Sequence, residues 1–329
     1  MKRRGHIGII IALLVWGGCI ASQATITPES LGFPAQVGPL ITSHWGQKAP
    51  YNFMCPLTDP TPWGGYLPNE DHCRAGCVAV AIGQIMRYHR WPDSGEGTAS
   101  VSYPLTGSNS HVFTVNFSQA TYDWDAMLDD YTNVDYTEQE GRAVAQLLYH
   151  CAVASQMIFG QSASATTNFA TAEALGRNFR YDISHVETKI RYLFTEREWM
   201  EMVYRELSEG RPIFYEAIDL SLTHGSYAHS FIIDGYREDG FVHVNWGWNG
   251  QQDGYYDIAR LDPDGYKFNF YQDMTIGIQA PPHEQEFILP PPSTINHQPS
   301  IIYTLDGRPV LHPQAPGIYI KDGRKIVVR

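Results

Sequence analysis

A cysteine near the start of an apolar helical pattern is the residue best placed to do chemistry. Cys77 lies in G-C-V-A-V-A-I-G-Q-I-M-R-Y-H, the segment from Gly76 to His89. Its apolar residues fall on one helical face, which predicts a helix with Cys77 at the N-terminus. Unpaired N–H groups and the helix dipole favour a thiolate there, and a neighbouring imidazolium can lower a cysteine pKa to roughly 3 to 4. The pattern therefore predicts a nucleophilic thiol.

A histidine suited to serve this thiol lies far downstream. His229 begins one predicted strand and Asn245 ends the next, with a turn at residues 238–240 between them. Antiparallel pairing of these strands would bring the two side chains close together. The amide oxygen of Asn245 would then accept a hydrogen bond from the imidazole and fix its tautomer, as the third group of a triad does. Trp246 or Trp248 would shield that hydrogen bond from water.

A donor for the developing oxyanion lies upstream of the thiol. Gln47 occurs in H-W-G-Q-K-A-P-Y-N. Its side-chain amide and the main-chain N–H of Cys77 would together form an oxyanion hole. A metal site is the weaker alternative: His72, Cys73 and Cys77 lack a second ligand pair in the sequence, and no H-E-x-x-H helix occurs. We expect neither a metal nor a cofactor.

Three blocks of sequence carry a resemblance to a known family. They are G-P-L-I-T-S-H-W-G-Q-K-A-P-Y-N, G-C-V-A-V-A-I-G-Q-I-M-R-Y-H-R-W-P and H-V-N-W-G-W-N-G, in this order. The chain resembles the streptopain family of bacterial cysteine peptidases, a branch of the papain-like group, over roughly residues 37 to 280. The resemblance implies the following roles: Cys77 as nucleophile, His229 as base, Gln47 as oxyanion donor, and Asn245 and Trp246 as orienting and shielding residues. It also suggests a hydrophobic substrate side chain two positions from the cut.

The chain departs from this family at residues expected to line the cleft. The family usually has Gly-Gly-His where this chain has Tyr227-Ala228-His229, and Gly where this chain has Asn249. These replacements would narrow the choice of substrate or signal lost activity.

A loop rich in small residues is expected to border the substrate. The family's Gly- and Ser-rich block appears here as M-I-F-G-Q-S-A-S-A-T, residues 157–166. By this resemblance we expect Ser162 and Ser164, together with Ala228 and Trp248, to contact the substrate.

The elements that position these residues follow a simple order. Thr137 with Glu140, and Thr195 with Glu198, are capping boxes that each begin a helix, the second ending at Gly210. Short β-branched or aromatic segments follow: Ile213 to Ala217, Ser230 to Gly235, Phe241 to Trp246 and Gly254 to Ile258. Helices followed by antiparallel strands indicate an α+β class. The resemblance implies a papain-like two-lobe fold, with the cysteine in a helical lobe and the histidine in an antiparallel sheet lobe.

The two ends of the chain have their own character. Residues 1–24 have a basic start and a short apolar run, which is typical of an export signal; the run is far short of the roughly 20 residues that span a bilayer. Lipidation at Cys19 stays open. Residues 25–36 form a short segment before the peptidase domain at 37–280, and this segment is too short for an inhibitory domain with its own core. We therefore expect activity without N-terminal processing.

The C-terminal end is expected to be a small appendage. Residues 281–299 are rich in proline and read as a stiff linker, and residues 300–329 as a few strands, Ile301 to Tyr303, Gly317 to Lys321 and Lys325 to Val328. This β segment resembles the sorting segment of exported Bacteroidetes proteins, so secretion machinery is an expected partner.

Composition and cysteine usage limit the remaining possibilities. The formal net charge of −12, without a basic cluster, argues against nucleic acid as a partner. After export, Cys55 and Cys73 are the candidates for a disulfide if Cys77 stays reduced, and Cys151 is expected to be a buried free thiol because it lies on an apolar helical face.

Together these observations predict a secreted or cell-surface cysteine endopeptidase. Its partners would be protein or peptide substrates. In place of a propeptide, restraint would come from export itself, from a separate inhibitor or from the C-terminal appendage. Two alternatives remain open at this point: a Cys-His transferase or amidase of the same fold, and a catalytically impaired surface-binding homologue.

Overall fold

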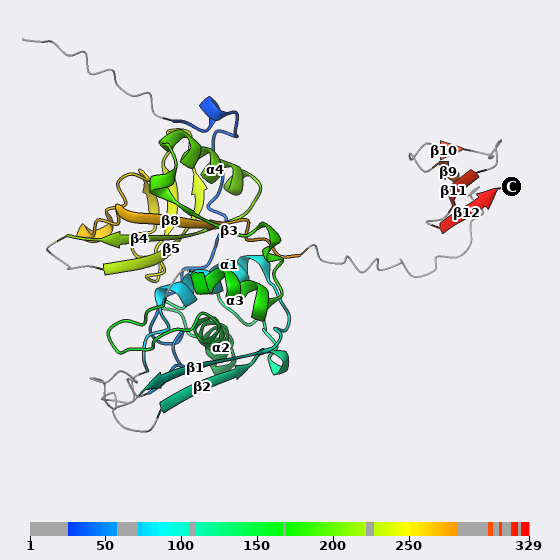
Figure 1. The fold of residues 1–329 in the computed structure, drawn as a ribbon. Coiled ribbons are helices and arrows are strands. Elements are labelled where there is room, and N and C mark those ends of the chain that lie inside the picture. The colour runs from blue at the N-terminus through cyan, green and yellow to red at the C-terminus, as the bar shows by residue number, and fades with distance from the viewer. Residues whose placement is uncertain are drawn as a thin grey trace, which may run out of the picture. The chain divides into compact units, whose positions relative to one another are not determined.

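The computed structural model describes residues 26–57, 72–104, 110–166, 169–221 and 227–281, together with the strand residues 302–304, 309–310, 317–321 and 324–328. The chain divides into two units, Met1–Pro281 and Pro282–Arg329. The first unit contains a helical part and a sheet part, the lower and upper parts of the ribbon in Figure 1. None of the helices in the described residues is both long and apolar enough to cross a membrane.

The helical part is built around two packed helices. It contains α1 (Cys77–His89), α2 (Glu138–Ala154) and α3 (Phe169–Phe179), with the antiparallel hairpin of β1 (Thr98–Pro104) and β2 (Ser110–Asn116). A capping box at Thr137 and Glu140 opens α2. The two helices α1 and α2 approach closely at Gly83, where an added Cβ would lie 2.3 Å from Leu148 Cδ2. This contact fixes α1, and so the position of its first residue.

The sheet part has six strands. They are β3 (Glu187–Ile190), β4 (Ile213–Asp219), β5 (Tyr227–Tyr236), β6 (Val242–Asn245), β7 (Gly254–Tyr256) and β8 (Phe270–Ile276). Their order is β3-β8-β4-β5-β6-β7, and every neighbouring pair is antiparallel. Helix α4 (Glu196–Ser208) begins with the capping box of Thr195 and Glu198. Short 3-10 turns complete the unit: Glu29–Leu31, Phe117–Gln119, Ile183–His185, Arg191–Leu193 and Pro263–Gly265.

Alternate residues of the central strands belong to two separate cores. Phe214 and Ile232 pack with the apolar face of α1, whereas Ile213 and Phe231 pack with Trp199 and its neighbours on α4. Successive strand side chains point to opposite faces of a sheet. The sheet therefore lies between α1 and α4, and a shift of one residue along β5 changes which core a side chain enters.

The second unit forms a small antiparallel sheet in the order β10-β9-β11-β12. Its strands are β9 (Ile302–Thr304), β10 (Pro309–Val310), β11 (Gly317–Lys321) and β12 (Arg324–Val328). The expected strands of this segment are present.

The predicted α+β class and papain-like architecture are confirmed, as are the cysteine-bearing helix, both capped helices and the four predicted strands. The sequence patterns did not predict α3, β3, β8 or the β1–β2 hairpin. The predicted signal peptide at 1–24 and residues 282–299 of the predicted linker lie outside the described residues.

Candidate active site

The candidate nucleophile occupies the first position of α1. Gly76, directly before it, has a φ of +93°. An added Cβ at Gly76 would lie 2.7 Å from Met157 Cε and 3.3 Å from Ser164 Cβ. Only glycine combines this backbone conformation with so close an approach. Residue 76 is therefore glycine because the 157–166 loop presses against the start of α1, and this contact places Cys77.

The electrostatics around Cys77 differ from the prediction. Its thiol is free, and the residue as a whole is partly exposed. Desolvation is the largest influence and raises the pKa of Cys77; hydrogen bonds from Ser230 and Val78 lower it, and the negative charge of Glu216 raises it. The predicted lowering of the cysteine pKa is therefore wrong for this structure. The cause is that burial of the sulfur outweighs the lowering by Ser230, the residue after His229, and by Val78.

The candidate base is held in one tautomer. His229 is 1% exposed. Its Nε2 lies 2.9 Å from the main-chain oxygen of Trp246. Because a carbonyl can only accept, Nε2 carries the hydrogen and Nδ1 keeps a lone pair. Nδ1 has no hydrogen-bond partner among the described residues. Burial lowers the pKa of His229 to about 4, so the ring is neutral at neutral pH with a vacant acceptor.

Aromatic rings enclose this imidazole. The His229 ring stacks on Trp248, with centroids 4.9 Å apart, and on Trp246, with centroids 6.2 Å apart and planes at 13°. The centroid of the Phe268 ring lies 5.5 Å from that of the His229 ring. Trp246 is fully buried, and Trp248 is partly exposed. The two tryptophans predicted to shield the histidine thus lie beside its ring.

The predicted hydrogen bond between Asn245 and His229 is wrong. The strand register pairs Asn245 with Ile232, three residues from His229. Side chains three positions apart on a strand point to opposite faces, so Asn245 faces α1 while His229 faces the aromatic cluster. The amide group of Asn245 donates to Ser43 O at 2.8 Å and accepts from Gln84 Nε2 at 3.0 Å. It ties the sheet to α1.

Gln84 is the centre of this polar cluster and was not singled out from the sequence. Its side chain is fully buried. Its Oε1 accepts from Ser43 Oγ at 3.1 Å and from Trp45 N at 3.0 Å, while its Nε2 donates to Asn245. A lone glutamine on an otherwise apolar helical face was the available signal. Gln84 fixes the segment that leads to Gln47.

Gln47 reaches the start of α1 through its main chain. Its carbonyl accepts from Ala75 N at 3.1 Å, two residues before Cys77. The Gln47 side chain is partly exposed and, among the described residues, makes no hydrogen bond, so its amide donors remain available.

The replacement at Asn249 has a structural explanation. Asn249 has a φ of 56°, a region that favours glycine and that asparagine tolerates better than most residues. Its main-chain N–H donates to Trp45 O at 3.1 Å. An added Cβ at Gly46 would lie 2.3 Å from Asn249 Oδ1. Asn249 therefore packs against the residue before Gln47.

Cys77 and His229 are not hydrogen-bonded to each other in the described structure. Nucleophile and base often meet with good geometry only when substrate binds. Ser230, the residue after His229, lies near enough to Cys77 to lower the pKa of its thiol.

The predicted substrate loop divides into an exposed and a buried part. Ser162 is exposed, and Ala228 is exposed on β5. Ser164 is 5% exposed, donates to Arg74 O at 2.7 Å and accepts from Gly160 N at 3.0 Å. Because its hydroxyl is already used, Ser164 holds the loop against residues 74–76 and does not present a free polar group. Substrate contact by Ser162, Ala228 and Trp248 stays a prediction.

A carboxylate that the sequence did not reveal positions Trp246. Asp253 Oδ1 accepts from Trp246 N at 2.8 Å, and its Oδ2 lies 3.1 Å from His44 Nδ1. Because the Trp246 carbonyl orients His229, Asp253 helps to position the histidine indirectly, by holding the main chain of Trp246.

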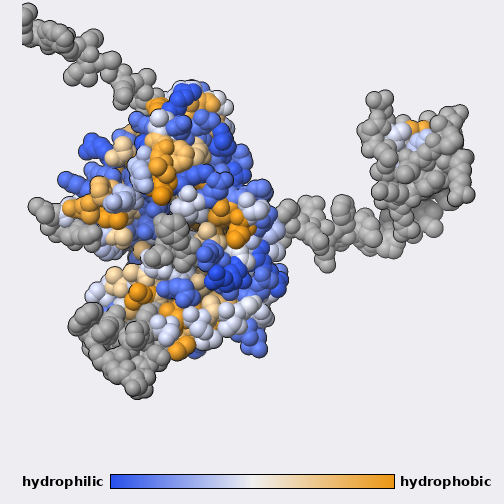
Figure 2. Space-filling model, viewed as in Figure 1, coloured by the Kyte–Doolittle hydropathy of each residue, from blue (hydrophilic) through white to orange (hydrophobic). Residues whose placement is uncertain are grey.

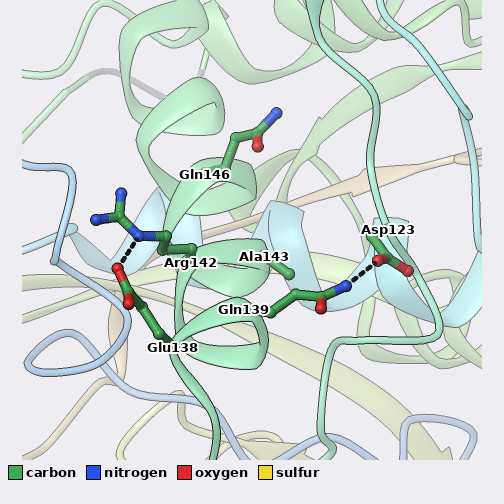
Figure 3. A pocket seen from close by; sticks show the side chains of 6 residues that line it. All are labelled: Asp123, Glu138, Gln139, Arg142, Ala143 and Gln146. Atoms are coloured by element: carbon green, nitrogen blue, oxygen red, sulfur yellow. Dashed lines mark hydrogen bonds and ion pairs between the residues drawn. The ribbon is translucent and has the colours of Figure 1, made fainter.

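The remaining cysteines and surface pockets take no part in this arrangement. Cys55 and Cys151 are buried free thiols, so the bridge considered for Cys55 and Cys73 is not formed in the structure. Among the described residues no cluster of three or more His, Cys, Asp or Glu side chains is arranged to hold a metal ion. Figure 3 shows a surface pocket along α2, with ion-paired Glu138 and Arg142; it contains none of the candidate site residues.

Comparison with known proteins agrees with this geometry. Residues 45–256 match the Peptidase C10 family. The chain is 31% identical over 258 residues to the thiol protease/hemagglutinin PrtT of Porphyromonas gingivalis, covering 76% of this chain and 27% of PrtT. It is 29% identical over 249 residues to streptopain of Streptococcus pyogenes, covering 72% of this chain and 60% of streptopain.

Solved structures point the same way. Active wild-type interpain A, a cysteine protease of Prevotella intermedia, superposes with a TM-score of 0.70 at 36% identity, covering 78% of this chain and 100% of that chain. A prointerpain A fragment gives a TM-score of 0.66 at 35% identity, covering 78% of this chain and 77% of that chain. The chain spans only part of the curated relatives it matches, but the match covers most of its own length: it belongs to the Peptidase C10 family of cysteine peptidases, with a papain-like fold.

Proposed function

We propose that the chain is a secreted cysteine endopeptidase that cleaves peptide bonds in proteins through an acyl-enzyme on Cys77. The observation that carries this proposal is the state of His229. Its Nε2–H donates to the Trp246 carbonyl, and its buried Nδ1 has no hydrogen-bond partner among the described residues. The next residue, Ser230, lies near the sulfur of Cys77. A neutral imidazole with a vacant nitrogen is what a general base requires.

The proposed reaction begins with the thiol. Cys77 Sγ attacks the carbonyl carbon of the scissile bond while its proton passes to Nδ1 of His229. This step requires Nδ1 to reach the sulfur once substrate is bound. The proton then passes to the leaving amine, and the C–N bond breaks to leave a thioester. Water, deprotonated by Nδ1, attacks the thioester and releases the acid product and the thiol.

The oxyanion formed in both halves of the reaction needs donors. The main-chain N–H of Cys77, at the first position of α1, has no partner within the helix. The uncommitted amide of Gln47, held near by the Ala75–Gln47 main-chain hydrogen bond, is the second donor. These two groups support stabilisation of negative charge on the carbonyl oxygen.

Export is supported by the sequence of residues 1–24, with its basic start and apolar run. We further propose that secretion machinery recognises residues 300–329, and that a separate inhibitor or this C-terminal segment restrains the enzyme. Expression of residues 25–329 beside a version ending near residue 280 tests the restraint. A lag in initial rate that disappears only on N-terminal trimming would contradict it.

The function is tested by incubating the mature protein and its Cys77→Ala variant with casein and with a mixed peptide library. We expect the wild type to release new peptide N-termini by hydrolysis and the variant to release none. Transfer of the acyl group to an added amine without net hydrolysis would indicate a transferase instead. No cleavage and no acyl transfer by the wild type would indicate a non-catalytic homologue.

A further inference from the structure

A carboxyl group lies beside the candidate nucleophile and is not used in the reaction above. Glu216 on β4 lies opposite Ser230 on β5 and opposite Asp273 on β8. Ser230 Oγ donates to Glu216 Oε2 at 3.3 Å. The same serine lowers the pKa of the Cys77 thiol and the charge of Glu216 raises it, so both residues lie near the sulfur. Glu216 is thus one side chain removed from the attacking atom.

Glu216 has no cation of its own. Among the described residues no lysine, arginine or histidine pairs with it, although its side chain is partly buried. The chain treats its buried glutamate differently. Glu206 is 6% exposed and receives two hydrogen bonds of 2.8 Å from the guanidinium of Arg211. Buried carboxylates are normally paired in this way, so the missing cation at Glu216 distinguishes it from a structural residue.

Apolar surface leads away from Glu216 along the same face of the sheet. Ile218 is the next residue of β4 on that face, and it lies opposite Ala228 and Phe270. Ala228 is exposed, and Phe270 is 48% exposed. Figure 2 shows hydrophobic side chains on the left of the sheet part, where Figure 1 places the end of β4 and the start of β8. Long cationic side chains bury their methylene stems on such surface and extend their charge beyond it.

We propose that Glu216 selects a lysine or arginine side chain on a substrate residue close to the scissile bond. This inference rests on the proposed peptidase function. The stem of the selected side chain packs along Ile218, Ala228 and Phe270, and its charge reaches Glu216 with Asp273 beside it.

The test uses internally quenched peptides that carry arginine, or its neutral isostere citrulline, at each of the three positions before the cut and the one after it. We expect one position at which the wild type prefers arginine by at least about tenfold in kcat/KM, the effect of one charge-assisted hydrogen bond. Glu216→Gln should reduce this preference to about twofold or less. Glu238→Gln, the same charge change in the exposed turn after β5, should leave the preference as in the wild type.

Failure of the inference is distinct from failure of the function. Cleavage of the peptides with no arginine preference, or with a preference that Glu216→Gln retains, overturns the role of Glu216 and leaves the peptidase intact. No cleavage of any peptide overturns both. If thermal unfolding shows that Glu216→Gln does not fold, the wild-type protein alone provides the test. Its preference for arginine should fall as the salt concentration is raised, because salt screens the attraction between charges. A salt-independent preference contradicts the proposal.

Discussion

The two faces of β5 and β6 near the nucleophile use polar groups in opposite ways. On the face toward α1, Asn245, Gln84 and Ser43 satisfy one another in a closed hydrogen-bond cluster. On the other face, His229 is packed among aromatic rings and keeps one ring nitrogen without a partner. Saturated groups hold the structure together, whereas a vacant buried acceptor is poised for proton transfer. Asn245 and His229 thus differ in task because they face different cores.

The largest loss of activity is expected from substitution of the proposed nucleophile or base. Cys77→Ala and His229→Ala should each reduce kcat/KM by several orders of magnitude and to a similar extent, because the two residues act as one unit. Cys151→Ala, which removes a buried free thiol on α2, is the matched control and should remain active. Retention of more than about a tenth of the activity by either site variant would remove it from the mechanism.

The next effect concerns the oxyanion donor. Gln47→Ala should lower kcat by about 10²- to 10³-fold with little change in KM, since the lost hydrogen bond forms only as charge develops. Gln139→Ala removes an exposed amide that hydrogen-bonds Asp123 Oδ2 and should leave kcat unaltered. Steady-state kinetics on one peptide would decide, and an unchanged kcat for the Gln47 variant would exclude that side chain.

Substitution of Asn245 should lower stability while leaving activity nearly intact, unlike substitution of His229 on the opposite face. Asn245→Ala leaves Gln84 Nε2 and Ser43 O buried without partners, so we expect a loss of about 2–4 kcal/mol in the free energy of unfolding. Urea unfolding measures this loss, and activity per folded molecule should stay within severalfold of the wild type. Asn269→Ala, whose amide lies in a more exposed loop, is the control for loss of an asparagine. An Asn245 variant of unchanged stability but lost turnover would return Asn245 to the catalytic group.

The smallest expected effect is the dependence of stability on pH at Glu216. Burial, with the charge of Asp273, raises the pKa of Glu216 to about 7. The folded state therefore holds this proton more tightly than the unfolded state, and the associated stability is present below the usual glutamate pKa and lost as pH rises toward and through 7. Relative to Glu216→Gln, the wild type should lose about 1–3 kcal/mol between pH 5 and pH 8. Parallel pH profiles for the two proteins would contradict the assigned environment.

Local signals made part of the fold predictable. The capping boxes at Thr137 and Thr195 are short-range patterns, and both helices begin where those patterns place them. Strand β8 lacks such a signal, because Gln272 and Asp273 interrupt its apolar residues. Its place beside β4 depends on long-range pairing that no local pattern encodes.

The site was predictable to a similar degree. Cys77 and Gln47 could be predicted because each lies in an uninterrupted sequence motif, and Cys77 also begins a clear helical pattern. The partner of His229 was assigned to the wrong residue, because the strand register, which shifts between Ile233 and Gly235, decides the face of each side chain. Glu216 was missed because a lone acidic residue in a strand is more often a solvated one.

The most direct test of the account is covalent labelling of Cys77 by a peptidyl epoxide, followed over time by mass mapping in the wild type, His229→Ala and Asn245→Ala proteins below the unfolding temperature of each. Labelling reports the reactivity of the thiol without requiring turnover. We predict a single label on Cys77, formed at similar rates in the wild type and Asn245→Ala and at least about a hundredfold more slowly in His229→Ala. Equal labelling of His229→Ala and the wild type, with slow labelling of Asn245→Ala, would contradict it.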